Sequence, residues 1–401
     1  MATKTFTGTL NANEFYNGLF NAYRLITTIS DGRSFESLSD KFRADGGMYA
    51  DKSVFTDMDV LLSRPWDPED SNILASEMTI TPKQQEITVN KKRQIAMTAE
   101  RYLSKRAWMD PYVFDQFNGV VQAQVRNTKR LHEQRMINVF LGTTTATGVK
   151  AAKGSQNIEI DVSTAVGDAT GEEKNRMTAQ TIMCALADLF DDLKDSTRLY
   201  TDNGFMKGYP EDEFEIVWNS EIYNSILEID LPTVYHDERL KRLLNGSERL
   251  TSRYFGSAVS AATTADGNTH RALSEYAIRV NASGEYAANG NQFVNVFPGD
   301  LLPSGTPIVT LSTAETSTKV DFTVNERKVG VLTYSTVHAY TADPSIICKI
   351  VHQNGVKYLS SFETETEFWN PKNLRTNRYL TWLYAEPEYL AAYPFITVYQ
   401  K

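Results

Sequence analysis

The sequence is poor in cysteine and histidine and has no catalytic or metal-binding motif. Cys184 and Cys348 are the only cysteines among 401 residues, too few for a disulfide scaffold, so nothing indicates an oxidising compartment. The five histidines are scattered, and neither His-Glu-x-x-His nor Cys-x-x-Cys occurs, which leaves zinc sites without support. The glycine-rich phosphate-binding motifs are also absent. We therefore predict a protein that is not an enzyme, with no catalytic residue, metal or cofactor.

Long apolar runs and an excess of basic charge are lacking as well. No apolar run approaches the roughly 18 residues of a membrane span, and the first residues lack the layout of a signal peptide, so we expect no membrane partner and synthesis in the cytoplasm. The net charge of −9 argues against a main surface that grips nucleic acid. It is compatible with a container that must not adhere to its contents. With 41% hydrophobic residues, the chain can bury a core and form two or three domains or one elaborated fold.

The most regular feature is a long helical segment. Asp110 is a good N-cap, Pro111 suits the first helical position, and Gly142 is expected to end the helix. Residues 111–141 contain no internal proline, so this rod is about 46 Å long at about 1.5 Å per residue. Helical periodicity predicts an apolar side of Val113, Phe114, Phe117, Val120, Val121, Val125, Leu131, Met136 and Val139 and a polar side that includes Arg126, Lys129, Arg130 and Glu133.

An arm and a hairpin are predicted before this helix. Residues 1–47 read as an arm with one helix around Phe15 and Leu19. Residues 49–97 contain β-type segments broken by turn residues, which predicts a long hairpin carrying Lys91-Lys-Arg93. A two-stranded ribbon is marginal in water, so the hairpin needs a neighbour to lie on. The basic triplet is either an electrostatic contact with a partner's acidic surface or a solvated turn.

A mixed α/β unit is predicted after the helix. Residues 178–193 carry apolar side chains at helical spacing, and Cys184 within them is expected to be a small buried residue rather than a nucleophile. A buried strand over 213–218 and short helices over 220–227 and 236–244 follow. Residues 255–340 then become β-like, with turn residues between the apolar segments.

The last part of the chain has a predicted hairpin and an acidic row. Asn354-Gly355 lies between apolar segments 345–352 and 356–362, which favours a tight two-residue turn. Glu363, Glu365 and Glu367 would share one face of a strand and repel unless water, a cation or basic side chains screen them. Basic partners are available in Arg101, Lys105, Arg106, Arg375 and Arg378. A solvated strand face and a cation site also stay open.

This order of elements resembles the major capsid protein of tailed bacteriophages with the Hong Kong 97 fold. The resemblance rests on an Ile/Val-rich strand over 86–97 that precedes a long helix ending in Asn-x-Phe-Leu-Gly at 138–142. It rests further on a later helix over 178–193 followed by Phe-Glu-Ile-Val-Trp at 214–218. It covers nearly the whole chain in order.

The resemblance implies an α+β fold with a defined division of the chain. It places an N-terminal arm at 1–47, an extended β-hairpin loop at 48–98, a peripheral domain at 99–177 with a spine helix at 111–141, an axial domain at 178–335 with a β-rich insertion at 255–330, and peripheral return strands at 336–401. The implied function is self-assembly into pentamers and hexamers of an icosahedral virion shell that encloses double-stranded DNA without sequence-specific binding. The arm is short, so a separate scaffolding protein is implied, beside a portal protein and a decoration protein.

The charged clusters then become candidate assembly contacts. They are Lys91, Lys92, Arg93, Arg101, Lys105, Arg106, Arg126, Lys129, Arg130, Glu363, Glu365 and Glu367. We expect removal of residues 49–97 to leave a soluble protein that forms no shells. Two alternatives stay open: an encapsulin-like compartment with the same fold, and a multidomain α/β enzyme.

Overall fold

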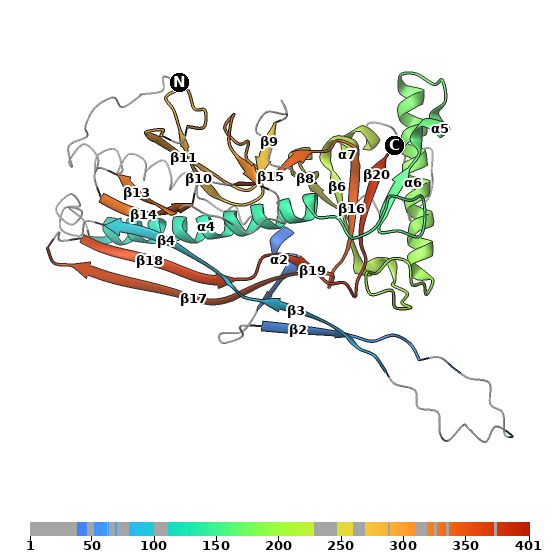
Figure 1. Ribbon diagram of the computed structural model, residues 1–401, viewed down its shortest axis with the longest axis horizontal. Coiled ribbons are helices and arrows are strands. Elements are labelled where there is room, and N and C mark those ends of the chain that lie inside the picture. The colour runs from blue at the N-terminus through green and yellow to red at the C-terminus, as the bar shows by residue number, and fades with distance from the viewer. Residues whose placement is uncertain are drawn as a thin grey trace.

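The computed structural model contains both helices and sheets, as predicted (Figure 1). It describes residues 38–45, 52–61, 63, 69, 80–99, 111–227, 247–259, 269–287, 289–309, 319–324, 327–333, 337–372 and 375–401. The predicted helices around Phe15 and over 236–244 lie outside the described residues. So do Asp110 and the candidate contacts Arg101, Lys105 and Arg106.

The long helix, α4 (Pro111–Thr143), is the central element and confirms the prediction of a rod of about 31 residues, with 33. It ends one residue after Gly142, whose role differs from the expected one. A Cβ on Gly142 would lie 2.1 Å from the carbonyl oxygen of Tyr254. Glycine is therefore required because the 3₁₀ turn Ser252–Tyr254 passes directly over the helix at this point.

One sheet runs along α4 in the order β1-β17-β18-β4. Its strands are β1 (Arg43–Asp45), β4 (Lys91–Ala99), β17 (Val356–Asn370) and β18 (Arg375–Tyr384), and β19 (Glu388–Tyr389) pairs with β17. Strand β1 is parallel to β17, whereas β18 is antiparallel to both β17 and β4. The short helix α2 (Leu38–Phe42) adds Leu38 and Phe42 to the core beneath α4.

A second sheet has helices on one face, and its other face packs against the core beneath α4. Its order is β5 (Asn157–Ile160), β20 (Phe395–Gln400), β16 (Ile346–His352), β6 (Phe214–Asn219) and β7 (Glu248–Leu250). Helices α5 (Val162–Val166), α6 (Glu172–Lys194) and α7 (Ser220–Leu227) contribute to the core on the helical side. Because both faces are covered, β16 is buried along its whole length. The predicted apolar positions of α6, from Ile182 to Leu193, are buried.

The turn at Asn354-Gly355 corrects the prediction of a tight hairpin. Strands β16 and β17 flank it as expected, and Gly355 N donates to His352 O at 2.7 Å. However, β16 pairs with β6 and β20, while β17 pairs with β1, β18 and β19. The turn therefore moves the chain from the second sheet to the first. The return strands were predicted to begin at residue 336, but the second sheet combines strands from before and after that residue.

The β-rich region lies on the opposite side of α4 from β17 (Figure 1). It consists of β8 (Gly256–Ala258), β9 (His270–Ala272), β10 (Tyr276–Val280), β11 (Gln292–Val296), β12 (Ile308–Val309), β13 (Lys319–Val324), β14 (Arg327–Thr333) and β15 (Val337–Ala342). Strand β15 pairs with β8, β9 and β12, and β10–β11 and β13–β14 form hairpins. A small core of Ala272, Ile278, Val280 and Val296 supports this region.

A hairpin leaves the body below the first sheet (Figure 1). Strand β2 (Lys52–Asp57) pairs in antiparallel register with β3 (Lys83–Thr88), from Lys52 opposite Thr88 to Asp57 opposite Lys83. This confirms the predicted hairpin for the described residues. The chain then enters β4, which is paired with β18 in the body.

Candidate interaction surfaces

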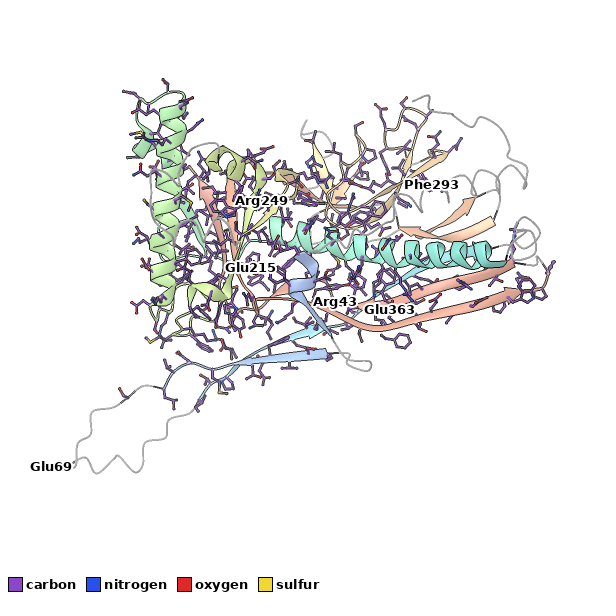
Figure 2. The ribbon with its side chains drawn as sticks, turned by 180° about the vertical axis from the view of Figure 1, so that it is seen from behind. Arg43, Glu69, Glu215, Arg249, Phe293 and Glu363 are labelled. Atoms are coloured by element: carbon purple, nitrogen blue, oxygen red, sulfur yellow. The ribbon has the colours of Figure 1, made fainter. Side chains whose placement is uncertain are left out.

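The hairpin β2–β3 and its extension present a row of exposed apolar side chains. Alternation along β2 points Phe55 towards the body and Val54 away from it. Val54, Met58, Val60, Leu61 and Ile80 remain between 52 and 64% exposed. Glu69 lies far beyond the body at the distal end (Figure 2). Apolar surface on so long a projection is typical of a site for another protein chain.

The root of the hairpin is anchored to the body. Ile87 is fully buried in a small core with Leu359, Ala385 and Leu390. Gln85 Nε2 donates to Tyr389 O at 3.0 Å, and Ala391 N donates to Gln85 Oε1 at 2.9 Å. The proximal half is therefore part of the fold, and the exposed apolar row lies on the face of the hairpin that points away from these contacts.

The basic triplet predicted on the hairpin lies instead on β4. Lys91 forms an ion pair with Glu386 at 3.3 Å, and Lys92 is exposed. Arg93 forms an ion pair with Glu275 at 2.5 Å and donates to the Tyr384 hydroxyl at 3.3 Å. The pairing of β4 with β18 explains the difference, because it draws residues 91–99 into the sheet. Of the triplet, Lys92 is the side chain most open to a partner.

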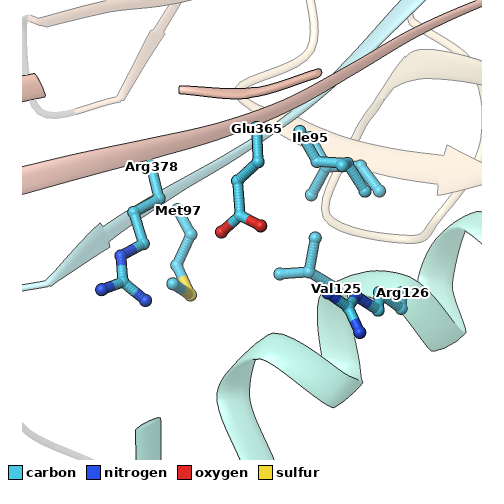
Figure 3. A pocket seen from close by; sticks show the side chains of 7 residues that line it. Ile95, Met97, Val125, Arg126, Glu365 and Arg378 are labelled. Carbon is cyan, nitrogen blue, oxygen red and sulfur yellow. The ribbon is translucent and has the colours of Figure 1, made fainter. Parts of the chain in front are cut away.

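The acidic row of β17 faces α4 within the same subunit. Glu363 forms an ion pair with Lys129 at 2.5 Å, and Glu367 forms one with Arg378 at 3.4 Å. Glu365 lies between Arg378 and Arg126 at a small pocket that also includes Val125 and Leu380 (Figure 3). Basic side chains thus pair with Glu363 and Glu367 and lie on both sides of Glu365, and two of them, Lys129 and Arg126, come from α4. Both Glu363 and Glu367 keep more than two fifths of the side chain exposed.

The sides of α4 differ from the helical-wheel prediction between residues 129 and 133. Lys129 and Glu133 are 6% and 4% exposed, whereas Leu131 is 41% exposed. Lys129 pairs with both Glu133, at 3.7 Å, and Glu363. The Tyr358 hydroxyl donates to Glu133 at 3.2 Å. Buried charges are tolerated when they are paired and hydrogen-bonded, so this part of the predicted basic face is an internal contact.

The electrostatics of this cluster follow from burial. Burial raises the pKa of Glu133, and the neighbouring Lys129 and Arg43 oppose the shift. Arg126 and Arg130 are exposed. Their guanidinium groups are open to a partner, whereas Lys129 is paired within its own subunit.

A second polar cluster, not predicted from the sequence, joins the β-rich region to α4 and β4. Glu275 accepts from Arg93 and lies 3.7 Å from His132 Nε2, and Asp300 pairs with Arg135 at 2.9 Å. Burial, and to a smaller extent Arg93, lowers the pKa of His132 to about 3, so this histidine is neutral at pH 7. The cluster fixes the β-rich region on the helix. Its only sequence signal is the polar residue pair His132 and Arg135 on the helix's apolar side.

No group of three or more His, Cys, Asp or Glu side chains in the described part of the chain is placed to hold a metal. Cys348 is buried, but Cys184 is exposed, which corrects the expected burial. Cys184 lies between the buried Met183 and the half-buried Ala185, on the side of α6 that faces solvent. Within the described ranges, no helix is long and apolar enough to cross a membrane.

Known structures share this architecture, although no family model and no curated protein matches the sequence. One similar chain belongs to the capsid structure of Staphylococcus phage Andhra, with a TM-score of 0.56 and 8% identity over 92% of this chain and 84% of that chain. Another belongs to the structure of the head fiber and inner core protein gp22 of native bacteriophage P68, with a TM-score of 0.50 and 10% identity over 87% of this chain and 80% of that chain. The resemblance to phage capsid proteins is thus confirmed at the level of the fold.

Proposed function

We propose that this chain is a major capsid protein of a tailed bacteriophage, with the Hong Kong 97 type of fold and no enzymatic role. It self-assembles into hexamers and pentamers that form an icosahedral shell around double-stranded DNA. The observation that carries the proposal is the projecting hairpin, on which Val54, Met58, Val60, Leu61 and Ile80 are exposed on the isolated subunit. Burying them against neighbours gives a favourable contact that a monomer lacks.

In this proposal each part of the chain has an assembly role. Residues 1–47 are the arm, 48–98 the extended loop, and α4 (Pro111–Thr143) the spine of the peripheral domain. Residues 178–335 form the axial domain with the β-rich insertion at 255–330. Strand β16 of the return segment supports the axial domain, because it pairs with β6. Strand β20 pairs with β5, which precedes the axial domain in the chain.

The proposed partners follow from the same scheme. Copies of the chain meet in hexamers and pentamers, a portal protein occupies one vertex, and a separate scaffolding protein guides assembly. A decoration protein has a candidate platform in the β-rich insertion, where Val294 and Leu301 are 42% and 55% exposed. The net charge of −9 favours DNA that is enclosed without adhering, because phosphate binding needs clustered lysine and arginine.

Electron microscopy of the expressed chain, alone and with a scaffolding protein, tests the proposal. Closed shells of uniform size are expected, and particles from infected cells should contain DNA that resists nuclease. A chain that stays monomeric in size-exclusion chromatography under all these conditions would contradict the proposal. Shells that hold a folded enzyme and no DNA would favour the encapsulin-like alternative.

A further inference from the structure

Two aspartates, one at the end of β2 and one just beyond it, connect the hairpin to a loop that follows α6. Asp57 accepts from Lys207 Nζ, and from Asn203 Nδ2 at 2.8 Å. Asp59 accepts from Arg198 Nη1 at 2.5 Å and from the backbone N–H of Met206 at 3.0 Å. The two carboxylates thus engage four donors on one loop, residues 197–207.

That loop is held firmly by the body. Thr197 and Lys207 exchange two backbone hydrogen bonds of 3.1 Å, which closes the loop at its base. Tyr209 N donates to Leu193 O at 2.9 Å, which ties the loop to the last turn of α6. Asn203 N donates to Ala391 O at 3.1 Å, so the loop is also fixed to the segment before β20. It forms a rigid support next to the hairpin.

Packing alone does not hold the hairpin at this place. A cavity of about 450 Å³ lies between β2–β3 and the body, lined by residues that include Phe55, Gln84, Lys207 and Tyr393. Beyond Phe55, which packs against the small core around Ile87, polar contacts therefore determine how far the hairpin tilts. Lys83 Nζ adds one more, to Asn203 O at 2.8 Å.

We propose that Asp57 and Asp59 are positioning residues for assembly, which set the angle at which the hairpin leaves the subunit by clamping it to the 197–207 loop. This inference rests on the proposed function for its consequence in a shell. Glu69 lies far past the clamp (Figure 2), so a small change in the angle at which the chain leaves Asp59 corresponds to a large displacement of Glu69. The clamp thereby determines where a neighbouring copy can be held.

The clamp is tested first in the subunit, independently of assembly. In an Asp57→Ala/Asp59→Ala variant, amide exchange at Met206 should become about tenfold faster, as for the loss of one hydrogen bond to a charged group. Spin labels on a Val60→Cys variant and on the native, exposed Cys184 should give a broader distance distribution when the aspartates are replaced. Glu86→Gln is the matched control, because Glu86 pairs with Lys52 inside the hairpin at 2.6 Å. Unchanged exchange and an unchanged distance distribution would overturn the proposal.

A second variant separates charge from hydrogen bonding and guards against misfolding. Asp59→Asn keeps an oxygen for the Met206 amide but loses the ion pair with Arg198, so it should broaden the distance distribution while Met206 stays protected. Combining Asp59→Arg with Arg198→Asp should narrow the distribution again. If the distance distribution of this swapped variant is as broad as that of Asp59→Asn, the ion pair does not hold the hairpin.

The assembly consequence is read by electron microscopy. Wild-type chain and Glu86→Gln should form shells of one size, whereas Asp57→Ala/Asp59→Ala should give a mixture of sizes and open sheets. If the double variant forms shells as uniform as those of the wild type, the positioning role is wrong although the proposed function stands. If the wild type forms no shells, the proposed function fails, and the exchange and distance measurements still decide whether the clamp exists.

Discussion

Lys349 is fully buried in β16, between the two cores of the molecule. Its ammonium group donates to Thr144 O, one residue past the end of α4, at 2.7 Å and to the Thr397 hydroxyl at 2.8 Å. Burial lowers the pKa of Lys349 from its usual range to about 7. The lysine thus links the long helix to the second sheet, although burial of its charge opposes folding.

This burial predicts a particular pH dependence of stability. Because the folded-state pKa is depressed, the unfolded chain binds more protons between pH 7 and the normal lysine pKa of about 10.4. Stability from this group therefore rises as the pH rises above 7, and its penalty is complete below pH 7. Relative to Lys349→Met, the wild type should gain free energy of unfolding between pH 7 and pH 9.5, measured by urea denaturation. The control is Lys372→Met, which replaces an exposed lysine and should show the same rise in free energy of unfolding as the wild type. An equal rise in Lys349→Met and Lys372→Met would contradict the prediction.

Replacement of Lys129 tests whether this side chain stabilises its own subunit or contacts a neighbouring subunit. Its ammonium group is paired with Glu133 and Glu363, and its side chain is 7% exposed. Replacing it with alanine leaves Glu133 buried with only the more distant Arg43, at 4.0 Å, as a charge partner, which should lower the free energy of unfolding by about 3 kcal/mol. Arg130→Ala, at an exposed position of the same helix, should change it by less than about 0.5 kcal/mol. If Lys129→Ala is as stable as the wild type but does not assemble, Lys129 is an assembly contact, as the sequence predicted.

At the scale of elements, α4 and α6 were predictable because their apolar residues recur with the helical period. The sides of α4 near Lys129 were not, because the partners Glu363 and Tyr358 lie more than 200 residues away. Asn354-Gly355 correctly predicts a turn between two strands. Turn chemistry is local, however, and cannot say whether the two strands pair with each other. The clamp at Asp57 and Asp59 was missed for the same reason, since its partners lie beyond α4 and α6.

The end of α4 supplies a test of close packing between elements. A methyl group at Gly142 would meet backbone atoms of Tyr254, the nearest at 2.1 Å, and backbone cannot rotate away as a side chain can. Gly142→Ala should therefore lower the free energy of unfolding by about 1–3 kcal/mol, despite the better helix propensity of alanine. Asn127→Ala, at an exposed position of α4, is the control for propensity and should be neutral or stabilising. Urea denaturation of both variants checks the sign, and a stabilising Gly142→Ala would contradict the close contact.

For the whole molecule, the structure changes the design of the hairpin deletion. Removing residues 49–97 would also remove most of β4, which pairs with β18 from Lys91 to Ala99, so loss of shells could then reflect a damaged sheet. A sharper variant replaces residues 58–82 with Asn-Gly, which closes a two-residue turn directly after the paired residues Asp57 and Lys83. It keeps β2, β3, β4 and the contacts of Asp57.

This shortened variant should fold but not form shells. It loses the exposed apolar side chains Met58, Val60, Leu61 and Ile80, none of which belongs to a core of the described residues, so its melting temperature should stay within a few degrees of the wild-type value. Without the projection, neighbouring subunits lose the surface that would hold them together, and size-exclusion chromatography should show subunits or small oligomers. The matched control is Glu86→Gln, which leaves the full hairpin in place. Shells of normal size from the shortened variant, seen by electron microscopy, would show that assembly does not depend on the hairpin.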